Sequence, residues 1–87
     1  MLINTQSNLV PKTVGPFRIQ KMPSIFMSRN GKNDIVIHKE NSENWGAMYD
    51  DKYYRIAMIL DAETFHPIRS NLTVPSEVLD NLKVWGF

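Results

Sequence analysis

Residues 24–39 read SIFMSRNGKNDIVIHK and contain the clearest structural signal in the chain. Two apolar runs flank the dipeptide Asn30-Gly31, and both of these residues tolerate the positive φ angles that tight hairpin turns require. The flanking runs are rich in aliphatic and aromatic side chains, which favour extended strands. The stretch therefore predicts an antiparallel β-hairpin, and with it a fold built on antiparallel strands.

The turn dipeptide leaves two registers open for this hairpin. A two-residue loop would pair Phe26 with Ile35. A three-residue loop would pair Met27 with Ile35 and Ile25 with Ile37, so that four apolar side chains share one face. We expect the second register, since a slip by one residue would turn these side chains to the opposite face of the sheet.

Further strands are predicted on both sides of this hairpin. Residues 17–22 (FRIQKM) alternate apolar and polar positions, as a strand does. Residues 46–60 (GAMYDDKYYRIAMIL) predict a second hairpin across residues 50–52. Its long strand, residues 53–60, is apolar at nearly every position, which is typical of a central strand. Tyr54, Ile56, Met58 and Leu60 are expected to share one face of it. Residues 65–68 (FHPI) suit a short edge strand because proline has no amide hydrogen to donate.

The two ends of the chain differ in character. Residues 1–16 contain two prolines and show no sustained period, so we expect an extended N-terminal arm. Near the other end, Val78, Leu79, Leu82 and Trp85 recur at helical spacing, which predicts a helix over about residues 75–84. Gly86 is the expected stop of this helix.

These elements define one domain of mainly β (α+β) class over residues 17–87. We expect a meander of four or five antiparallel strands, with closure into a small SH3-like barrel as an option, and one short C-terminal helix. Eighty-seven residues allow a single small core. With no cysteine in the chain, no disulfide can reinforce this core.

Composition also bounds the class of protein and its location. A hydrophobic fraction of 43% is too high for a disordered chain. No apolar run approaches the roughly 20 residues that span a bilayer. The first ten residues, MLINTQSNLV, lack the basic and apolar regions of a secretory signal. We therefore expect a cytoplasmic protein with no membrane association.

The titratable residues do not form a recognisable catalytic or metal-binding motif. His38 and Glu40 lie two positions apart, but no third ligand has the spacing that a zinc site needs. No serine lies in a nucleophile elbow, and the four glycines form no phosphate-binding loop. We expect a protein that is not an enzyme and holds no cofactor.

The expected function is binding to a larger protein, as an inhibitor or accessory subunit. Aromatic residues and arginine are favoured anchors of protein interfaces. The C-terminal helix and its aromatic tail provide the first candidate surface, and the long strand provides the second. The candidate partner-binding residues are Trp85, Gly86, Phe87, Tyr53, Tyr54 and Arg55.

The charge distribution suits a polar partner or contact between copies of the chain. Residues 1–39 hold six basic residues and one acidic residue, a balance of +5, while residues 40–87 hold four basic and eight acidic residues, a balance of −4. We therefore keep homo-oligomer formation as a further expectation.

Single-stranded nucleic acid is an alternative partner. Small β-barrels bind single strands through aromatic rings within a basic groove. The residues expected to do so here are Arg18, Arg29, Lys32 and Phe26. The acidic C-terminal half argues against this alternative, because phosphate binding depends on lysine and arginine.

The final residues, NLKVWGF, resemble the C-terminus of the CcdB family of plasmid toxins. Chains of that family end in a helix followed by Trp-Gly and an aliphatic residue. Trp85 and Gly86 match this pattern, and Phe87 stands where the family has the aliphatic residue. The resemblance covers about six residues and implies an SH3-like barrel whose tail inserts into DNA gyrase and poisons it.

Overall fold

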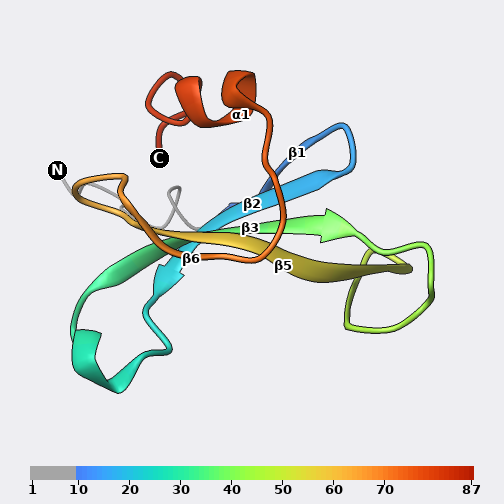
Figure 1. The fold of residues 1–87 in the computed structure, drawn as a ribbon, viewed down its shortest axis with the longest axis horizontal. Helices are drawn as coiled ribbons and strands as arrows, with labels where there is room; N and C mark the ends of the chain where they lie inside the picture. The colour runs from blue at the N-terminus through green and yellow to red at the C-terminus, as the bar shows by residue number, and fades with distance from the viewer. Residues whose placement is uncertain (1–9) are drawn as a thin grey trace, which may run out of the picture.

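The structure is a computed structural model that describes residues 10–87. Within these residues, six antiparallel strands form one curled sheet that resembles half of a barrel, and one short helix lies against it (Figure 1). The strands are β1 (Lys12–Val14), β2 (Phe17–Pro23), β3 (Asn33–Glu40), β4 (Ala47–Tyr49), β5 (Lys52–Asp61) and β6 (Pro67–Ser70). The helix is α1 (Ser76–Asp80). The predicted fold class, mainly β with a C-terminal helix, is confirmed.

Strand β5 organises the sheet. The order is β1-β2-β3-β5-β4, with β6 also paired to β5. One edge of β5 pairs with β3 over residues 54–61. The other edge pairs with β4 at residues 52–54 and with β6 at residues 58–60. Residues 55–57 of that edge therefore lie between two short strands, and neither strand covers them.

The hydrophobic core lies between the sheet and the C-terminal segment. Its buried members are Phe17, Ile19, Ile35, Ile37, Ala57, Met58, Leu60, Val74, Val78 and Leu82. Strands β2, β3 and β5 and the C-terminal segment contribute to the set, so α1 covers the face of the sheet that these side chains share (Figure 1). Burial of each large aliphatic side chain stabilises the fold by about 1.5–3 kcal/mol.

The two faces of β5 differ from the expectation. Met58 pairs with Ile37 and Ile56 pairs with His38, so Ala57 is an extra residue in a β-bulge. Ile37 and His38 are neighbours on a strand and point to opposite faces. Met58 therefore faces the core, whereas Ile56 lies on the opposite face. The prediction that all four apolar side chains of this strand share one face was wrong, because a bulge inverts the alternation.

The Asn30-Gly31 turn also differs from the prediction. Strand β2 already ends at Pro23, and Lys21 rather than Met27 pairs with Ile35. Residues 24–32 form a longer connection that contains a 3₁₀ turn, η2 (Met27–Arg29). Asn30, with φ −57° and ψ 131°, is followed by Gly31 at φ +86°, which is a type II turn rather than a hairpin turn. The predicted register was therefore wrong.

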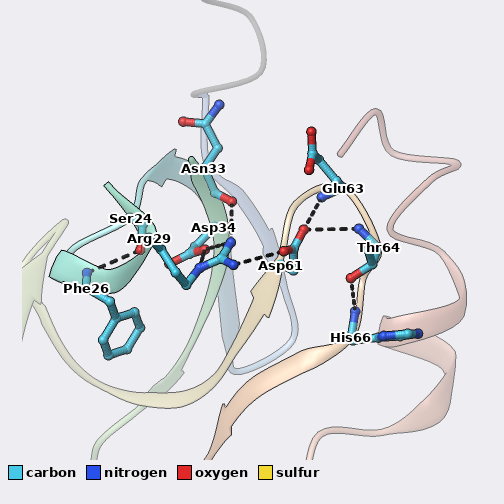
Figure 2. Close-up of polar contacts among 9 residues, drawn as sticks. All are labelled: Ser24, Phe26, Arg29, Asn33, Asp34, Asp61, Glu63, Thr64 and His66. Carbon is cyan, nitrogen blue, oxygen red and sulfur yellow. Dashed lines mark hydrogen bonds and ion pairs between the residues drawn. The ribbon is translucent and has the colours of Figure 1, made fainter. Parts of the chain in front are cut away.

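A cluster of charged side chains holds this connection in place. Arg29 donates to Asp34 at 2.7 and 3.0 Å and to Asp61 at 3.0 Å (Figure 2). The two aspartates are directly opposite each other on β3 and β5. The Asp34 side chain is almost fully buried, and a buried carboxylate needs a paired charge. Arg29 thus anchors residues 24–32 to the face of the sheet opposite α1 (Figure 1).

The second predicted hairpin is present. Tyr49 pairs with Lys52, so Asp50-Asp51 form a two-residue turn. Their φ angles of +50° and +65° are both positive, as in the type I′ turns that suit hairpins. Edge strand β6 begins at Pro67, two residues later than predicted, because Phe65 adopts φ +65° in the preceding turn.

Part of the expected N-terminal arm belongs to the sheet. Strand β1 pairs with β2 through Lys12, Thr13 and Val14, so these residues form an element where none was predicted. Residues 1–9 of the arm lie outside the described residues.

The C-terminal helix is shorter than predicted. Regular α-helix covers only Ser76–Asp80, and residues 81–86 continue as turns. Gly86, at φ +95°, donates its amide to the carbonyl of Lys83, and the Phe87 amide donates to the carbonyl of Leu82. These two hydrogen bonds form the Schellman motif. In this motif the last residue, here Phe87, commonly contacts the residue whose carbonyl its amide caps, here Leu82. Across residues 10–87, no helix is long and apolar enough to cross a membrane.

Candidate functional site

A pocket of about 470 Å³ opens at the uncovered stretch of β5. We call it the edge notch, because it lies in the sheet edge between β4 and β6. Residues 45–47, residues 54–56 of β5 and residues 71–72 line it, together with one residue of β3. The lining residues are His38, Trp45, Gly46, Ala47, Tyr54, Arg55, Ile56, Asn71 and Leu72.

The walls of the edge notch depend on a close backbone contact. Gly46 adopts φ +111°, and a Cβ atom there would overlap the carbonyl oxygen of Tyr54. Only glycine permits this approach. On the other side, Asn71 and Leu72 donate their amides to the carbonyl of Ala57 at 2.8 and 3.0 Å. The Asn71 side chain donates to the carbonyl of Ile56 at 3.3 Å. The notch is thus a fixed feature of the fold.

Two large apolar side chains are exposed in this region, Trp45 in the lining of the notch and Met48 on the adjacent strand β4. Trp45 is 52% exposed, and its indole N–H donates to Glu43 at 2.9 Å. Met48 on β4 is 54% exposed and lies directly opposite Tyr53. Exposed tryptophan and methionine side chains that lie close to a pocket are typical of binding surfaces.

His38 is the buried polar group of the notch. It is 5% exposed, and its Nδ1 atom has no hydrogen-bond partner among the described residues. Burial, and secondarily the positive charge of Arg18, lower the pKa of His38 below its ordinary value of 6.5. The imidazole is therefore neutral at pH 7.

An aromatic layer supports His38 from the side of β4. The Tyr49 ring lies 5.4 Å from His38 and 5.9 Å from Tyr54. The Arg18 guanidinium stacks 3.6 Å from the centre of the Tyr49 ring, and it donates to Gln20 at 3.0 Å. Such stacking fixes the rings of this layer in place.

Arg55 provides the formal charge of the notch. It is exposed and makes no ion pair within residues 10–87. Its cross-strand neighbour is another cation, Lys39. The nearby carboxylates have other contacts, since Glu40 pairs with Lys52 at 3.2 Å and Glu43 accepts from Trp45. Like charges directly opposite each other are unfavourable, so an anion at this position would relieve the repulsion.

The structure places the predicted partner-binding residues in two groups. Tyr54 and Arg55 line the edge notch, and Tyr53 is half-buried beside it. The aromatic tail lies elsewhere: Trp85 and Phe87 are half-buried and pack against the hydrophobic core. The Lys12 ammonium lies 5.2 Å from the Trp85 ring. The tail residues therefore do not join Tyr54 and Arg55 in one site.

Sequence reasoning missed His38 and Trp45 as members of this site. Trp45 stands alone in a polar connection next to Gly46, and a lone tryptophan in such a segment is itself a signal of a binding surface. The position of His38 gave no comparable signal, because its burial depends on the sheet and on the hairpin that carries Tyr49.

The residues expected to bind nucleic acid do not form one groove. Arg18 is buried against Tyr49, and Arg29 is held by two carboxylates. Phe26 is half-buried, with the Arg69 guanidinium 5.6 Å from its ring. Lys32 is exposed. Two of the three cations are thus engaged in internal contacts.

Residues 10–87 hold no group of three or more His, Cys, Asp or Glu side chains placed to bind a metal ion. Comparison with known proteins finds no matching family model, curated protein or solved structure.

Proposed function

We propose that this protein is a non-catalytic module that binds a larger protein, as an inhibitor or accessory subunit. The observation that carries the proposal is the edge notch with Trp45 exposed in its lining and Met48 exposed on the adjacent strand β4. A concave apolar site with exposed aromatic and methionine side chains matches the composition of interface cores. Tyr54 and Arg55 supply the types of residue that dominate binding energy.

The C-terminal helix and tail form a second docking surface in this proposal. Val84 is 76% exposed, and the half-buried rings of Trp85 and Phe87 lie beside it in the chain. Together they offer apolar contact area next to the helix.

A cytoplasmic location is part of this proposal, since a small chain without cysteine cannot use the disulfides that stabilise many small secreted domains.

The test is capture of a partner from a cell lysate by the tagged protein, compared across surface variants. Trp45→Ser and Met48→Ser change the notch surface, and Val84→Asp changes the C-terminal surface. Met27→Ser is the matched control, because Met27 is an equally apolar and still more exposed side chain that lies in η2 and does not line the notch. We expect at least one of the first three variants to lose a protein that the control retains.

Two outcomes would overturn the proposal. One is that all variants capture the same proteins as the wild type. The other is that the wild type sediments as a homo-oligomer that Trp45→Ser dissociates, since the notch face would then be a contact between copies of the chain.

The nucleic-acid and gyrase-directed alternatives remain predictions. The internal contacts of Arg18 and Arg29 leave few free cations for phosphate groups. Nothing in the geometry of the tail favours gyrase over another protein.

A further inference from the structure

We propose that the edge notch recognises a large apolar side chain that lies next to a carboxylate in the partner protein. This inference rests on the proposed function and assigns a ligand chemistry to the same site. The notch is concave, mainly apolar, and carries a single unpaired positive charge, and each of these properties selects one part of the ligand.

The size and lining of the notch select an apolar side chain. A pocket of about 470 Å³ lies within the range of roughly 300–1,000 Å³ that ligand sites occupy. Its apolar lining comes from Trp45, Ala47, Tyr54, Ile56 and Leu72. An aromatic or branched aliphatic side chain of the partner would bury its surface against these groups.

The backbone of β5 does not provide the recognition. The carbonyls of Ile56 and Ala57 already accept hydrogen bonds from Asn71 and Leu72. A partner segment therefore cannot add as a regular strand along residues 55–57, as segments do at free sheet edges. The partner is instead bound through its side chains.

The charge of the notch selects an anion. His38 is neutral at pH 7, so Arg55 is the one charged side chain in the lining. Arg55 has no carboxylate partner within residues 10–87 and faces Lys39. A guanidinium matches the two oxygens of a carboxylate in a bidentate pair. A cationic group at the same position would face repulsion from both residues.

The experiment uses two small probes that differ only in charge. N-acetyl-phenylalanine carries the ring and a carboxylate, and N-acetyl-phenylalaninamide carries the ring and a neutral amide. Each is titrated into the ¹⁵N-labelled protein at millimolar concentration, and the amide and indole N–H shifts are followed. We expect both probes to shift the signals of Trp45, Arg55 and Ile56. The acid should bind about two- to fivefold more tightly, which is the contribution of an exposed ion pair.

Variants separate the two parts of the recognition. Arg55→Gln should abolish the preference for the acid, so that acid and amide bind with equal affinity, whereas the exposed control Lys32→Gln should leave the preference intact. Ala47→Phe should fill the notch and weaken both probes. Equal affinity for acid and amide in the wild type, or shifts that do not concentrate around the notch, would overturn the inference.

These titrations contain no partner protein, so their outcome is independent of the capture experiment. If the probes bind without charge preference while Trp45→Ser still loses a partner, the proposed function stands and the ligand chemistry is wrong. If the acid is preferred but no surface variant changes capture, the proposed function fails instead.

Discussion

At the level of single residues, Gly86 and Phe87 show why the chain carries aromatic groups after its last helical turn. Gly86 adopts the left-handed conformation that lets two successive amides cap the carbonyls of Lys83 and Leu82. Phe87 occupies the position of the Schellman motif that contacts the third residue before the cap, and it packs against the core. Phe87 thus has a structural role that its position in the sequence did not reveal.

We expect Gly86→Ala to lower the free energy of unfolding by about 1–2 kcal/mol, because an alanine is strained at φ +95°. No atom lies within 4 Å of the added Cβ, so the loss reports backbone strain rather than a clash. Urea denaturation measures it. Gly86→Asn is the control and should lose less, since asparagine tolerates this conformation. Equal stability of Gly86→Ala and the wild type would contradict the Schellman assignment.

His38 gives the fold a dependence on pH. Its pKa in the folded protein is lowered by burial, so the folded state binds fewer protons than the unfolded state. The full stability is present above the ordinary pKa of 6.5 and is lost as the pH falls from there toward the lower pKa of the folded protein. The slope is at most about 1.4 kcal/mol per pH unit.

We therefore expect the urea midpoint of the wild type to fall between pH 7.5 and 5.5. His38→Phe keeps a ring but cannot titrate, so its midpoint should stay nearly level over this window. His66→Gln is the matched control at an exposed position and should behave as the wild type does. A wild-type midpoint that does not change over the window would show that His38 is not buried in solution.

At the level of elements, the two predicted hairpins had different outcomes for a physical reason. The turn at Asp50-Asp51 joins β4 and β5, and these two strands pair directly with each other. The local sequence therefore determines the geometry of the turn. The Asn30-Gly31 turn lies in a connection that Arg29 ties to Asp34 and Asp61. Asp61 is distant in the sequence, so a local pattern could not reveal that tie.

The hairpin turn also offers a way to stabilise the protein. Asp50 and Asp51 both hold positive φ angles that cost energy for residues with a Cβ atom. Asn-Gly is the preferred pair for this turn, so we expect Asp50→Asn combined with Asp51→Gly to raise the free energy of unfolding by about 0.5–2 kcal/mol. Thermal and urea unfolding measure the gain, and an unchanged or lower stability would count against this turn geometry.

At the level of the whole molecule, the C-terminal segment completes the core of a small protein. Val78 and Leu82 are buried against the sheet, whereas Val84 in the same segment is mostly exposed. A core of this size depends on each large side chain. The helix is too short to form without this packing.

We expect Leu82→Ala to lower the free energy of unfolding by about 2–5 kcal/mol, which is the usual cost of a cavity in a core. Val84→Ala should change it little, because that side chain is largely solvated. Urea unfolding followed by circular dichroism compares the two variants. If Leu82→Ala were as stable as Val84→Ala, the helix would not cover the core as described.

Only two of the nine residues that line the candidate site, Tyr54 and Arg55, could be predicted from the sequence. Tyr54 and Arg55 were candidates because aromatic and arginine side chains stand together on a predicted strand. The notch itself could not be predicted, because its lining comes from β3, the β4 region, β5 and the segment after β6. No local pattern specifies that two short strands leave residues 55–57 uncovered between them.

The sequence by itself determined the class of the fold, most of the strands, the second hairpin and the stripe of the C-terminal helix, because these follow from apolar periodicity and turn residues. Tertiary structure decided the register at residues 24–32, the bulge at Ala57, the pairing of β1 and the role of Phe87. Apart from the local pairing of β1 with β2, each of these depends on contacts between distant residues, such as Arg29 with Asp61. Such contacts leave no periodic trace in the sequence.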